Sequence, residues 1–297
     1  MIRTVSYSQI SSFRQCPLKW QLQKLEGLVP PVEHPRRALG TAWHSALEAH
    51  YAAFRRNDDE GRPRNLIEAY AEVDYAIERA GVDAETAEAL RWMYAGYVEL
   101  YGDDADWEIL AIEHEFSVPL ARIGGVSYHY HGFIDLIVRE RSTGNIYIVD
   151  HKSSRGKDAT KAAWQRESDL DDQFSGYQAA MQLKVARKLR LPATGTIYAL
   201  ARTDKLKRDM VLEERFGRYR AFRSEQTLEA TWDDLIATTR AMHSVRTGRM
   251  AVWSAPTPDR CGWGCDFVEP HLMARAQGRP VADAAIDYGF IRKEVAE

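Results

Sequence analysis

Residues 132–152 read GFIDLIVRERSTGNIYIVDHK. Two apolar runs, FIDLIV and IYIV, flank the polar segment RERSTGN, whose Ser, Thr, Gly and Asn residues favour a turn. Two such runs on either side of a turn predict a β-hairpin. Each run also carries an acid, Asp135 or Asp150, that a plain buried strand would not accommodate. The hairpin and its two acids therefore bear on both fold and function.

The register of the hairpin decides whether the two acids meet. If the loop is even and centred between Ser142 and Thr143, Asp135 lies opposite Asp150, with Lys152 on the same face. Like charges opposite each other destabilise a ladder, so this arrangement predicts a bound cation. A divalent metal held by carboxylate oxygens is the simplest candidate, with the lysine left for a substrate charge or a water. The alternative is a solvated hairpin face with an Asp-Lys pair.

Length and composition are those of an ordinary globular protein. The chain has 297 residues, 45% hydrophobic and 28% charged, enough for one large domain or two smaller ones. No apolar run is long enough to span a bilayer, and the start MIRTVSYSQ does not resemble a signal peptide, so we expect a cytoplasmic protein without a membrane partner. Three cysteines argue against a disulfide framework and leave metal binding or ordinary burial.

The net charge of −3 does not by itself indicate a polyanion partner. Basic residues do follow the hairpin, at Arg155, Lys157, Lys161 and Arg166. A basic surface beside an acidic metal site would suit nucleic acid, although solvated helix faces carry such charges as well.

Helical patterns dominate the first third of the chain. They predict helices from Ser8 or Ser11 to about Leu25, from about Thr41 after a loop HPRRALG, over 65–79 and over 84–101. On the second helix His44, Leu47, Glu48 and Tyr51 share one face. A histidine there is either a metal ligand or a satisfied structural residue.

Strands and helices alternate in the rest of the chain. The sequence predicts a strand over 107–120, a turn at Gly124-Gly125 and then the hairpin. After the hairpin it predicts a helix from Asp171 or Asp172, strands at 194–202 and 210–219, a helix over 225–245, and a Pro- and Gly-rich stretch with two cysteines. We therefore predict a single α/β domain, residues 1–297, with a mixed central sheet flanked by helices. Its parts are a mostly helical segment 1–105, a sheet core 106–220, and a C-terminal helix with a Cys-containing segment, 221–297.

Four segments in this order, GTAWHSALE, HGFIDLI, IVDHK and QFSGYQ, resemble the RecB-like branch of the PD-(D/E)XK nuclease superfamily. The resemblance implies a restriction-endonuclease-like core and hydrolysis of phosphodiester bonds with Mg²⁺ or Mn²⁺. It assigns metal binding to His44, Asp135, Asp150 and the backbone carbonyl of His151, catalysis to Lys152, substrate contacts to Gln173 and Tyr177, and a supporting position to Glu48.

A second resemblance concerns the cysteines. Cys16, Cys261 and Cys265 are similar to those that hold an iron-sulfur cluster in CRISPR-associated adaptation-type, phage and AddB-type nucleases. The position of the fourth cysteine is His271 here, and the gap between the second and third is one residue longer. Three interpretations stay open: a Cys3His [4Fe-4S] cluster, a Cys3His Zn²⁺ site, and no metal.

The resemblance implies a metal-dependent DNA exonuclease that acts on DNA ends, with single-stranded DNA expected, in bacterial or phage repair, recombination or DNA metabolism. The sequence lacks the P-loop pattern, so unwinding would come from a helicase or recombination partner; an oligomer is compatible with the family. The first alternative is a catalytically silent module that binds DNA ends, against which the intact Asp135, Asp150 and Lys152 argue. A sequence-specific endonuclease ranks lower, since no separate reading domain is visible.

Overall fold

The computed structural model describes residues 1–31, 35–154, 161–185, 193–203, 211–257, 261 and 265–294. The chain divides into two compact units. The first contains Met1–Glu33, Ser117–Gly132 and Trp232–Glu297, and the second contains His34–Phe116 and Phe133–Thr231. Strands β3 (Trp107–Ile123) and β4 (Val126–Glu140) contribute to both units, so each unit is described with its own part of them.

The second unit contains the predicted hairpin within a mixed sheet, ordered β4, β5 (Ile146–Ser154), β6 (Gly195–Arg202) and β7 (Phe216–Ala221). β4 pairs antiparallel with β5, β5 parallel with β6, and β6 antiparallel with β7, while β3 also pairs with β4. The pairs Leu136↔Val149 and Arg139↔Ile146 confirm the predicted centre of the hairpin between Ser142 and Thr143.

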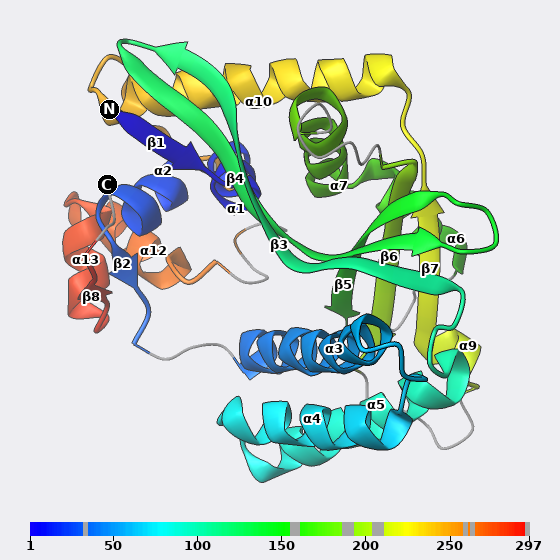
Figure 1. Cartoon of the computed structure of the whole chain (residues 1–297). Helices are drawn as coiled ribbons and strands as arrows, with labels where there is room; N and C mark the ends of the chain where they lie inside the picture. The colour runs from blue at the N-terminus through cyan, green and yellow to red at the C-terminus, as the bar shows by residue number, and fades with distance from the viewer. Residues whose placement is uncertain are drawn as a thin grey trace. The chain divides into compact units, whose positions relative to one another are not determined.

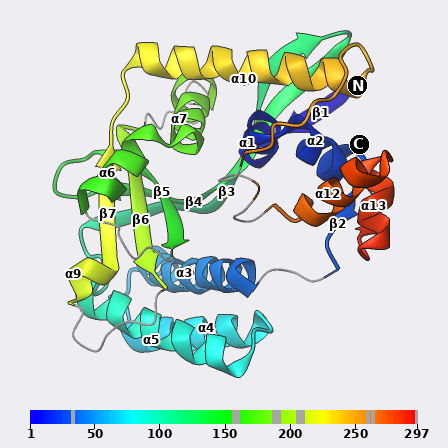
Figure 2. The same ribbon diagram turned by 180° about the vertical axis from the view of Figure 1, so that it is seen from behind.

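Strand β6 shows why helices cover both faces of this sheet. Ile197 and Ala199 pack with Tyr51 and Phe54 of α3 (Pro35–Asp59), while Tyr198 and Leu200 pack with α6 (Lys161–Leu170) and α7 (Asp172–Ala179) on the opposite face. Alternate side chains of a strand point to opposite faces, so a strand that is apolar throughout must be buried on both. Figures 1 and 2 show α3 and α7 on opposite sides of β5 and β6. The predicted α/β class with a mixed sheet is confirmed.

The helices on the α3 side are α3 (Pro35–Asp59), α4 (Leu66–Arg79) and α5 (Ala84–Tyr101). Asn65 and Asp83 accept hydrogen bonds from first-turn amides, which fixes the starts of α4 and α5 as the sequence predicts. The loop prediction for HPRRALG is wrong over residues 35–40, where α3 has already begun. Proline is favoured in the first turn of a helix because its missing N–H would have no partner there.

The opposite side contains α6 (Lys161–Leu170), α7 (Asp172–Ala179) and a π-helical turn, η2 (Ala180–Val185). The predicted start of α7 is confirmed, with Asp171 as its cap. Helix α6, which includes the predicted basic residues Lys161 and Arg166, was not anticipated; Arg155 and Lys157 lie outside the described residues. The strand predicted over 210–219 is wrong at Leu212–Arg215, which forms α9 before β7.

The first unit contains the remaining elements. They are β1 (Ile2–Val5), α1 (Tyr7–Gln15), α2 (Pro17–Trp20), the π-helical turn η1 (Gln21–Leu25), β2 (Leu28–Val29), α10 (Glu225–Arg246, from Trp232 on), α12 (Val268–Gln277), α13 (Val281–Asp287) and β8 (Ile291–Arg292). The single first helix predicted from Ser8 or Ser11 is wrong, because Ser6 caps α1 and the chain is extended at Cys16 before Pro17.

The C-terminal segment has a small core of its own. Phe267, Ala285 and Phe290 pack with Leu22 and Leu28, and β8 pairs antiparallel with β2. The N-terminal strand β1 pairs parallel with β4, and the predicted turn at Gly124 and Gly125 has positive φ at both residues. None of the helices in the described ranges combines the length and apolar character that a membrane span requires.

Candidate active site

The two acids of the hairpin lie at adjacent positions on β4 and β5 of the second unit. The Asp135 side chain is 13% exposed and the Asp150 side chain 5% exposed. The register that pairs Leu136 with Val149 sets them at the next opposing position, so the sequence-based geometry is confirmed. The alternative of a solvated hairpin face is excluded by the burial of Asp150.

Helix α3 delivers His44 to this pair. Its Nδ1 atom lies 3.2 Å from Asp135 Oδ2, which also accepts a hydrogen bond of 2.8 Å from the backbone N–H of His151. The helix can approach the sheet here because Gly40 has no side chain; a Cβ atom at that position would lie 3.3 Å from Ser153 Oγ. In the motif GTAWHSALE, the glycine thus allows the close approach of α3 that brings the histidine to the site.

Helix α7 contacts the site from the other face through its predicted pair of residues. Gln173 Nε2 donates to Asp150 Oδ1 at 3.2 Å, and Gln173 Oε1 accepts from Lys152 Nζ at 3.1 Å. Lys152 Nζ also lies 2.6 Å from Asp150 Oδ2. Tyr177, one turn later, is hydrogen-bonded to Gln173 and packs edge-on against Phe116 with ring centroids 5.1 Å apart. Gln173 therefore holds the carboxylate and the ammonium in one arrangement.

The side chain of His151 packs against α3 and makes no hydrogen bond with the cluster. Its ring is 3% exposed and stacks on Tyr51 of α3, with centroids 5.8 Å apart and planes 14° from parallel. Neither ring nitrogen has a hydrogen-bond partner, and burial lowers the pKa of His151 to about 3. His151 thus contacts the site through its backbone N–H, and metal binding by its carbonyl stays a prediction.

The ionisable groups of the site perturb one another. Burial raises the pKa of Asp150 to about 6, although the charge of Lys152 opposes this shift. Burial acts in the same direction on Asp135, but the hydrogen bond and charge of His44 bring its pKa below the usual value. Burial alone would lower the pKa of His44, and Asp135 raises it above the usual value. Asp135 and His44 therefore each stabilise the charged form of the other.

Glu113 of β3 is a further acidic residue that the sequence analysis missed. Burial raises its pKa to about 7, and the charges of Asp135 and of the exposed Glu48 act in the same direction. Its φ angle of 44° is unusual for a residue other than glycine. Glu113 could have been found from the sequence, because it is an acid within the apolar strand pattern ILAIEHEF. Asp135 was identified by the same kind of pattern.

The donor set suits a hard divalent cation. Three carboxylates and an imidazole interact at one place, and oxygen-rich sets of this kind suit Mg²⁺ and Mn²⁺. The buried Asp150 Oδ2 accepts no hydrogen bond of standard geometry, despite its contact with Lys152. As placed, no group of three or more His, Cys, Asp or Glu side chains among the described residues is arranged to hold a metal ion. The residue types fit such an ion. In this structure the carboxylates contact side chains of the protein, Asp135 that of His44 and Asp150 that of Lys152.

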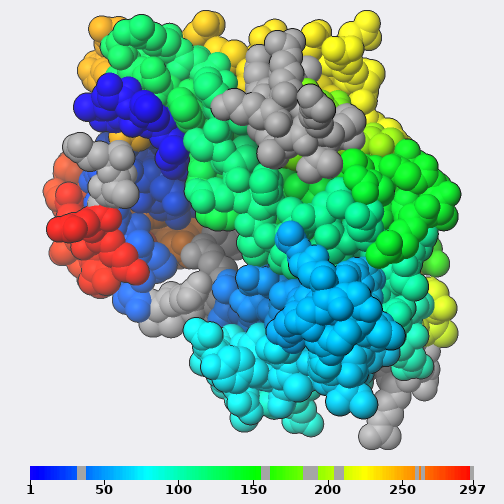
Figure 3. Space-filling model, in the orientation of Figure 1, coloured from blue at the N-terminus to red at the C-terminus, as the bar shows by residue number. Residues whose placement is uncertain are grey.

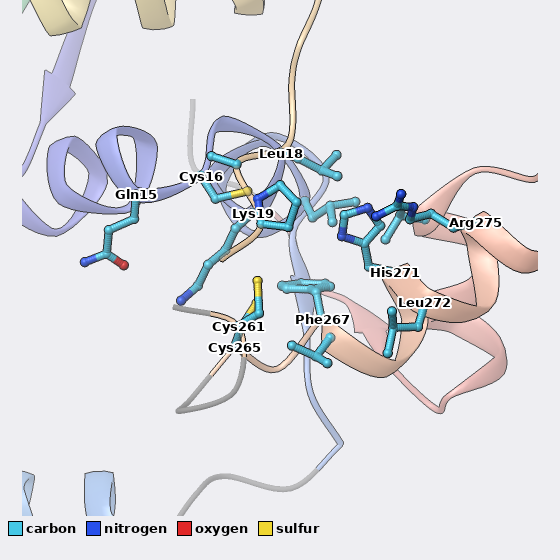
Figure 4. A pocket seen from close by; sticks show the side chains of 15 residues that line it. Gln15, Cys16, Leu18, Lys19, Cys261, Cys265, Phe267, His271, Leu272 and Arg275 are labelled. Atoms are coloured by element: carbon cyan, nitrogen blue, oxygen red, sulfur yellow. The ribbon is translucent and has the colours of Figure 1, made fainter. Parts of the chain in front are cut away.

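The predicted cysteine site lies in the first unit, where Cys16, Cys261 and Cys265 are free thiols lining one cavity of about 120 Å³. Burial raises the pKa of Cys265, and the neighbouring thiols act in the same direction. Figure 4 shows the sulfur of Cys16 facing the stretch with the other two cysteines, while His271 of α12 lies beside Arg275. His271 also lines the cavity, so the structure brings the four predicted residues to one place without a coordinating arrangement.

Comparison with known proteins shows which family the sequence matches. A sequence model described as the PD-(D/E)XK nuclease superfamily matches residues 4–269. No protein with a curated description matches the chain. Among solved structures, SSO0001 is 13% identical over 79% of this chain and 75% of its own, with a TM-score of 0.32. A presumptive exonuclease from Eubacterium rectale is 12% identical over 86% of this chain and 85% of its own, with a TM-score of 0.46.

Proposed function

The chain belongs to the PD-(D/E)XK nuclease superfamily, and from this premise we propose that it is a Mg²⁺- or Mn²⁺-dependent deoxyribonuclease that degrades DNA from its ends, preferentially as single strands. The observation that carries the proposal is the buried cluster of Asp135, Asp150 and Lys152, which Gln173 connects. A nuclease fold used only to bind DNA would have no use for a lysine held against a buried carboxylate. The preference for ends and single strands rests on the motif resemblance alone.

His44, Asp135, Asp150 and the backbone carbonyl of His151 would hold the metal ion. When bound, the ion supplies charge neutralisation at the phosphate and a more acidic water. Burial alone would lower the pKa of Lys152, but the charge and hydrogen bond of Asp150 raise it above its usual value. The ammonium therefore stays protonated near neutral pH, where it can stabilise negative charge on the phosphate but cannot remove a proton.

The test compares the wild-type protein with Asp150→Asn on four DNA substrates in Mg²⁺ or Mn²⁺. Linear single strands and linear duplexes, each labelled at one end or the other, report cleavage polarity. Circular single strands and supercoiled plasmid have no ends and report internal cleavage. We expect the wild type to shorten linear single strands fastest, to spare both circular substrates, and to lose activity in EDTA.

Each outcome distinguishes one candidate function. Cleavage of circular substrates would replace the exonuclease by an endonuclease. Binding of labelled ends without cleavage, by wild type and variant alike, would favour a DNA-end-binding module. Equal cleavage by Asp150→Asn and wild type would show that the hairpin is not the active site. Asp150→Asn removes one candidate ligand oxygen but keeps the shape of the side chain. It should reduce the cleavage rate at least about 100-fold, which is the size of effect seen when a contact to the transition state is removed.

We also propose that Cys16, Cys261 and Cys265, with His271, hold a soft metal centre in the first unit, either a [4Fe-4S] cluster or Zn²⁺. Three free thiols at one cavity support this proposal, since thiolates prefer soft metals. Iron and zinc analysis of anaerobically purified protein, with absorbance near 400 nm, distinguishes the cluster from zinc. Stoichiometric metal that disappears in Cys16→Ala is expected; protein free of both metals with unchanged stability in that variant would overturn the proposal.

A further inference from the structure

Three arginines from separate segments of the first unit interact at one place. Arg3 lies on β1, Arg246 is the last residue of α10, and Arg249 directly follows Gly248, which has positive φ. Arg3 lowers the pKa of Arg246, and all three arginines lower the pKa of His243, for which burial is the largest cause. The three arginines thus share His243 as a neighbour, and we call Arg3, Arg246 and Arg249 the arginine cluster.

Specific contacts of the backbone and of His243 join the segments that carry the three arginines. Arg3 is opposite Tyr128 in the parallel pairing of β1 with β4. The hydroxyl of Tyr128 lies 3.0 Å from His243 Nδ1, so β4 is joined to the last turns of α10. On its other side His243 packs against Gly124, where a Cβ atom would lie 2.5 Å from Nε2. The turn between β3 and β4 is therefore fitted to α10.

The segment after α10 is equally well defined. Gly248 has φ 70°, and the Met250 N–H donates to the carbonyl of Ser244 at 3.1 Å. This closing turn carries the exposed Arg249 directly beside the end of the helix. Figures 1 and 2 show the N-terminus beside the C-terminal end of α10, and Figure 3 shows β1 against the hairpin of β3 and β4 on one face.

The arginine cluster is unusual because its charge is not neutralised. Within the described ranges of the chain, no carboxylate makes an ion pair with any of its three members. Exposed arginines of the second unit do make such pairs, for example Arg91 with Asp74. The C-terminus of α10 offers a partial negative charge of about one half, which stabilises one cation in the last turn but not three. Arg246 is also half-buried over the ring of Trp20, at 5.8 Å from its centroid.

We propose that the arginine cluster is a contact surface for the phosphates of DNA. Guanidinium groups without carboxylate partners bind phosphate by charge and by paired N–H donors. The inference rests on the proposed function, because a nuclease has DNA as its substrate. It adds a phosphate-binding surface in the first unit to an active site built entirely from residues of the second. The cluster would bind the backbone of the strand without reading its bases.

The test measures how DNA affinity depends on salt. A fluorescently labelled single strand of about 30 nucleotides is titrated in Mg²⁺ with Asp150→Asn as the uncleaving parent, at several KCl concentrations. Each phosphate contact that is lost should reduce the slope of log K against log salt by about 0.7 on single strands. The double variant Arg3→Gln/Arg249→Gln in that parent should therefore lose about 1.4 of slope and bind about tenfold or more weakly at 0.1 M salt.

Two controls separate charge from folding and from general effects. Arg3→Lys/Arg249→Lys keeps both charges and should retain most of the slope. Arg91→Gln removes an arginine that already has an acidic partner and should leave the slope unchanged. Thermal melting verifies that every variant is folded. Arg246→Gln is added last, because it also removes a packing contact with Trp20.

The outcomes separate this inference from the proposed function. If the parent binds DNA and the wild type cleaves it, an unchanged slope and affinity in the double Gln variant would overturn the arginine cluster as a phosphate surface. An equal loss in Arg91→Gln would overturn it too, since the effect would then be one of net charge. If the parent does not bind DNA and the wild type does not cleave it, the proposed function itself fails, and this inference with it.

Discussion

Glu113→Gln offers a direct test of whether the carboxylates of the candidate site repel one another. The substitution removes one negative charge beside Asp135 and Glu48 but keeps the size of the side chain. It also leaves the positive φ of residue 113 in place, so backbone strain is the same in both proteins. In metal-free protein at pH 8 we expect the variant to be more stable than the wild type.

The magnitude follows from the pKa. Glu113 has a pKa raised from 4.5 to about 7, so the folded protein holds its proton over a range where the unfolded chain has lost it. Folding stability therefore falls as pH rises from about 4.5 to 7, and the full cost is present above pH 7. The difference in pKa corresponds to at most about 3 kcal/mol. Because the carboxyl group is partly solvated, screening reduces this to about 1–2 kcal/mol.

The assay is thermal unfolding of wild type and variant in EDTA between pH 4.5 and 8. A gain of about 1–2 kcal/mol at pH 8 corresponds to a rise in Tm of roughly 2–6 °C, and it should disappear near pH 4.5. Glu229→Gln, which removes an exposed acid from α10, is the matched control and should show no such pH-dependent gain.

Added Mn²⁺ should stabilise the wild type more than the variant. A ligand that binds only the folded state stabilises it in proportion to its affinity, and the wild type offers the ion one more nearby negative charge. The wild type should therefore gain more in Tm from the same Mn²⁺ concentration. A variant that is equally or less stable in EDTA at pH 8, or a gain that persists unchanged at pH 4.5, would refute the argument from charge repulsion.

Three further predictions concern how the site is held. Gln173→Ala should reduce the cleavage rate about 10- to 100-fold with little change in Tm, because Lys152 and Asp150 lose their connecting amide; Gln165→Ala, which removes a half-buried glutamine of α6 that contacts none of these residues, is the control, and an unchanged rate in Gln173→Ala would contradict the role. Gly40→Val should lower the cleavage rate more than Gly40→Ala, since the added atoms meet Ser153 and displace α3. Equal rates in the wild type and both variants would show that the close approach of α3 to the sheet is unimportant. His151→Leu should keep at least about a third of the activity at every pH, because the buried neutral ring makes no hydrogen bond; a loss of 100-fold in a folded variant would mean that the ring takes part.

The hairpin could be predicted in detail because its signals are local. Turn residues locate the loop, an even loop centred between Ser142 and Thr143 sets Asp135 opposite Asp150, and the pairing of Leu136 with Val149 agrees with that register. The caps of α4, α5 and α7 were also local, since an Asn or Asp directly precedes each helix. Helix α6 and the early start of α3 were missed because loop-forming residues such as Pro35 outweighed the weaker helical pattern.

The parts of the site that could not be predicted depend on contacts across the sequence. Glu113 lies on β3, outside the hairpin of β4 and β5, and only the pairing of β3 with β4 brings it to Asp135. The bridge that Gln173 makes was likewise invisible, because a Q-x-x-x-Y spacing shows which residues share a helix face but not what they contact. The arginine cluster joins residues more than two hundred positions apart, whereas the basic residues that the sequence emphasised follow the hairpin directly.

The arrangement of the second unit explains how a sheet can tolerate two carboxylates at neighbouring positions. Each acid has a partner from a different source: His44 of α3 contacts Asp135, while Lys152 of β5 and Gln173 of α7 contact Asp150. Removing a single partner should therefore destabilise the protein through the acid left behind, whereas removing the acid together with its partner should cost less. His44→Ala should accordingly lower the Tm in EDTA more than His44→Ala/Asp135→Asn does. Equal losses in the two proteins would show that His44 acts on stability by packing alone.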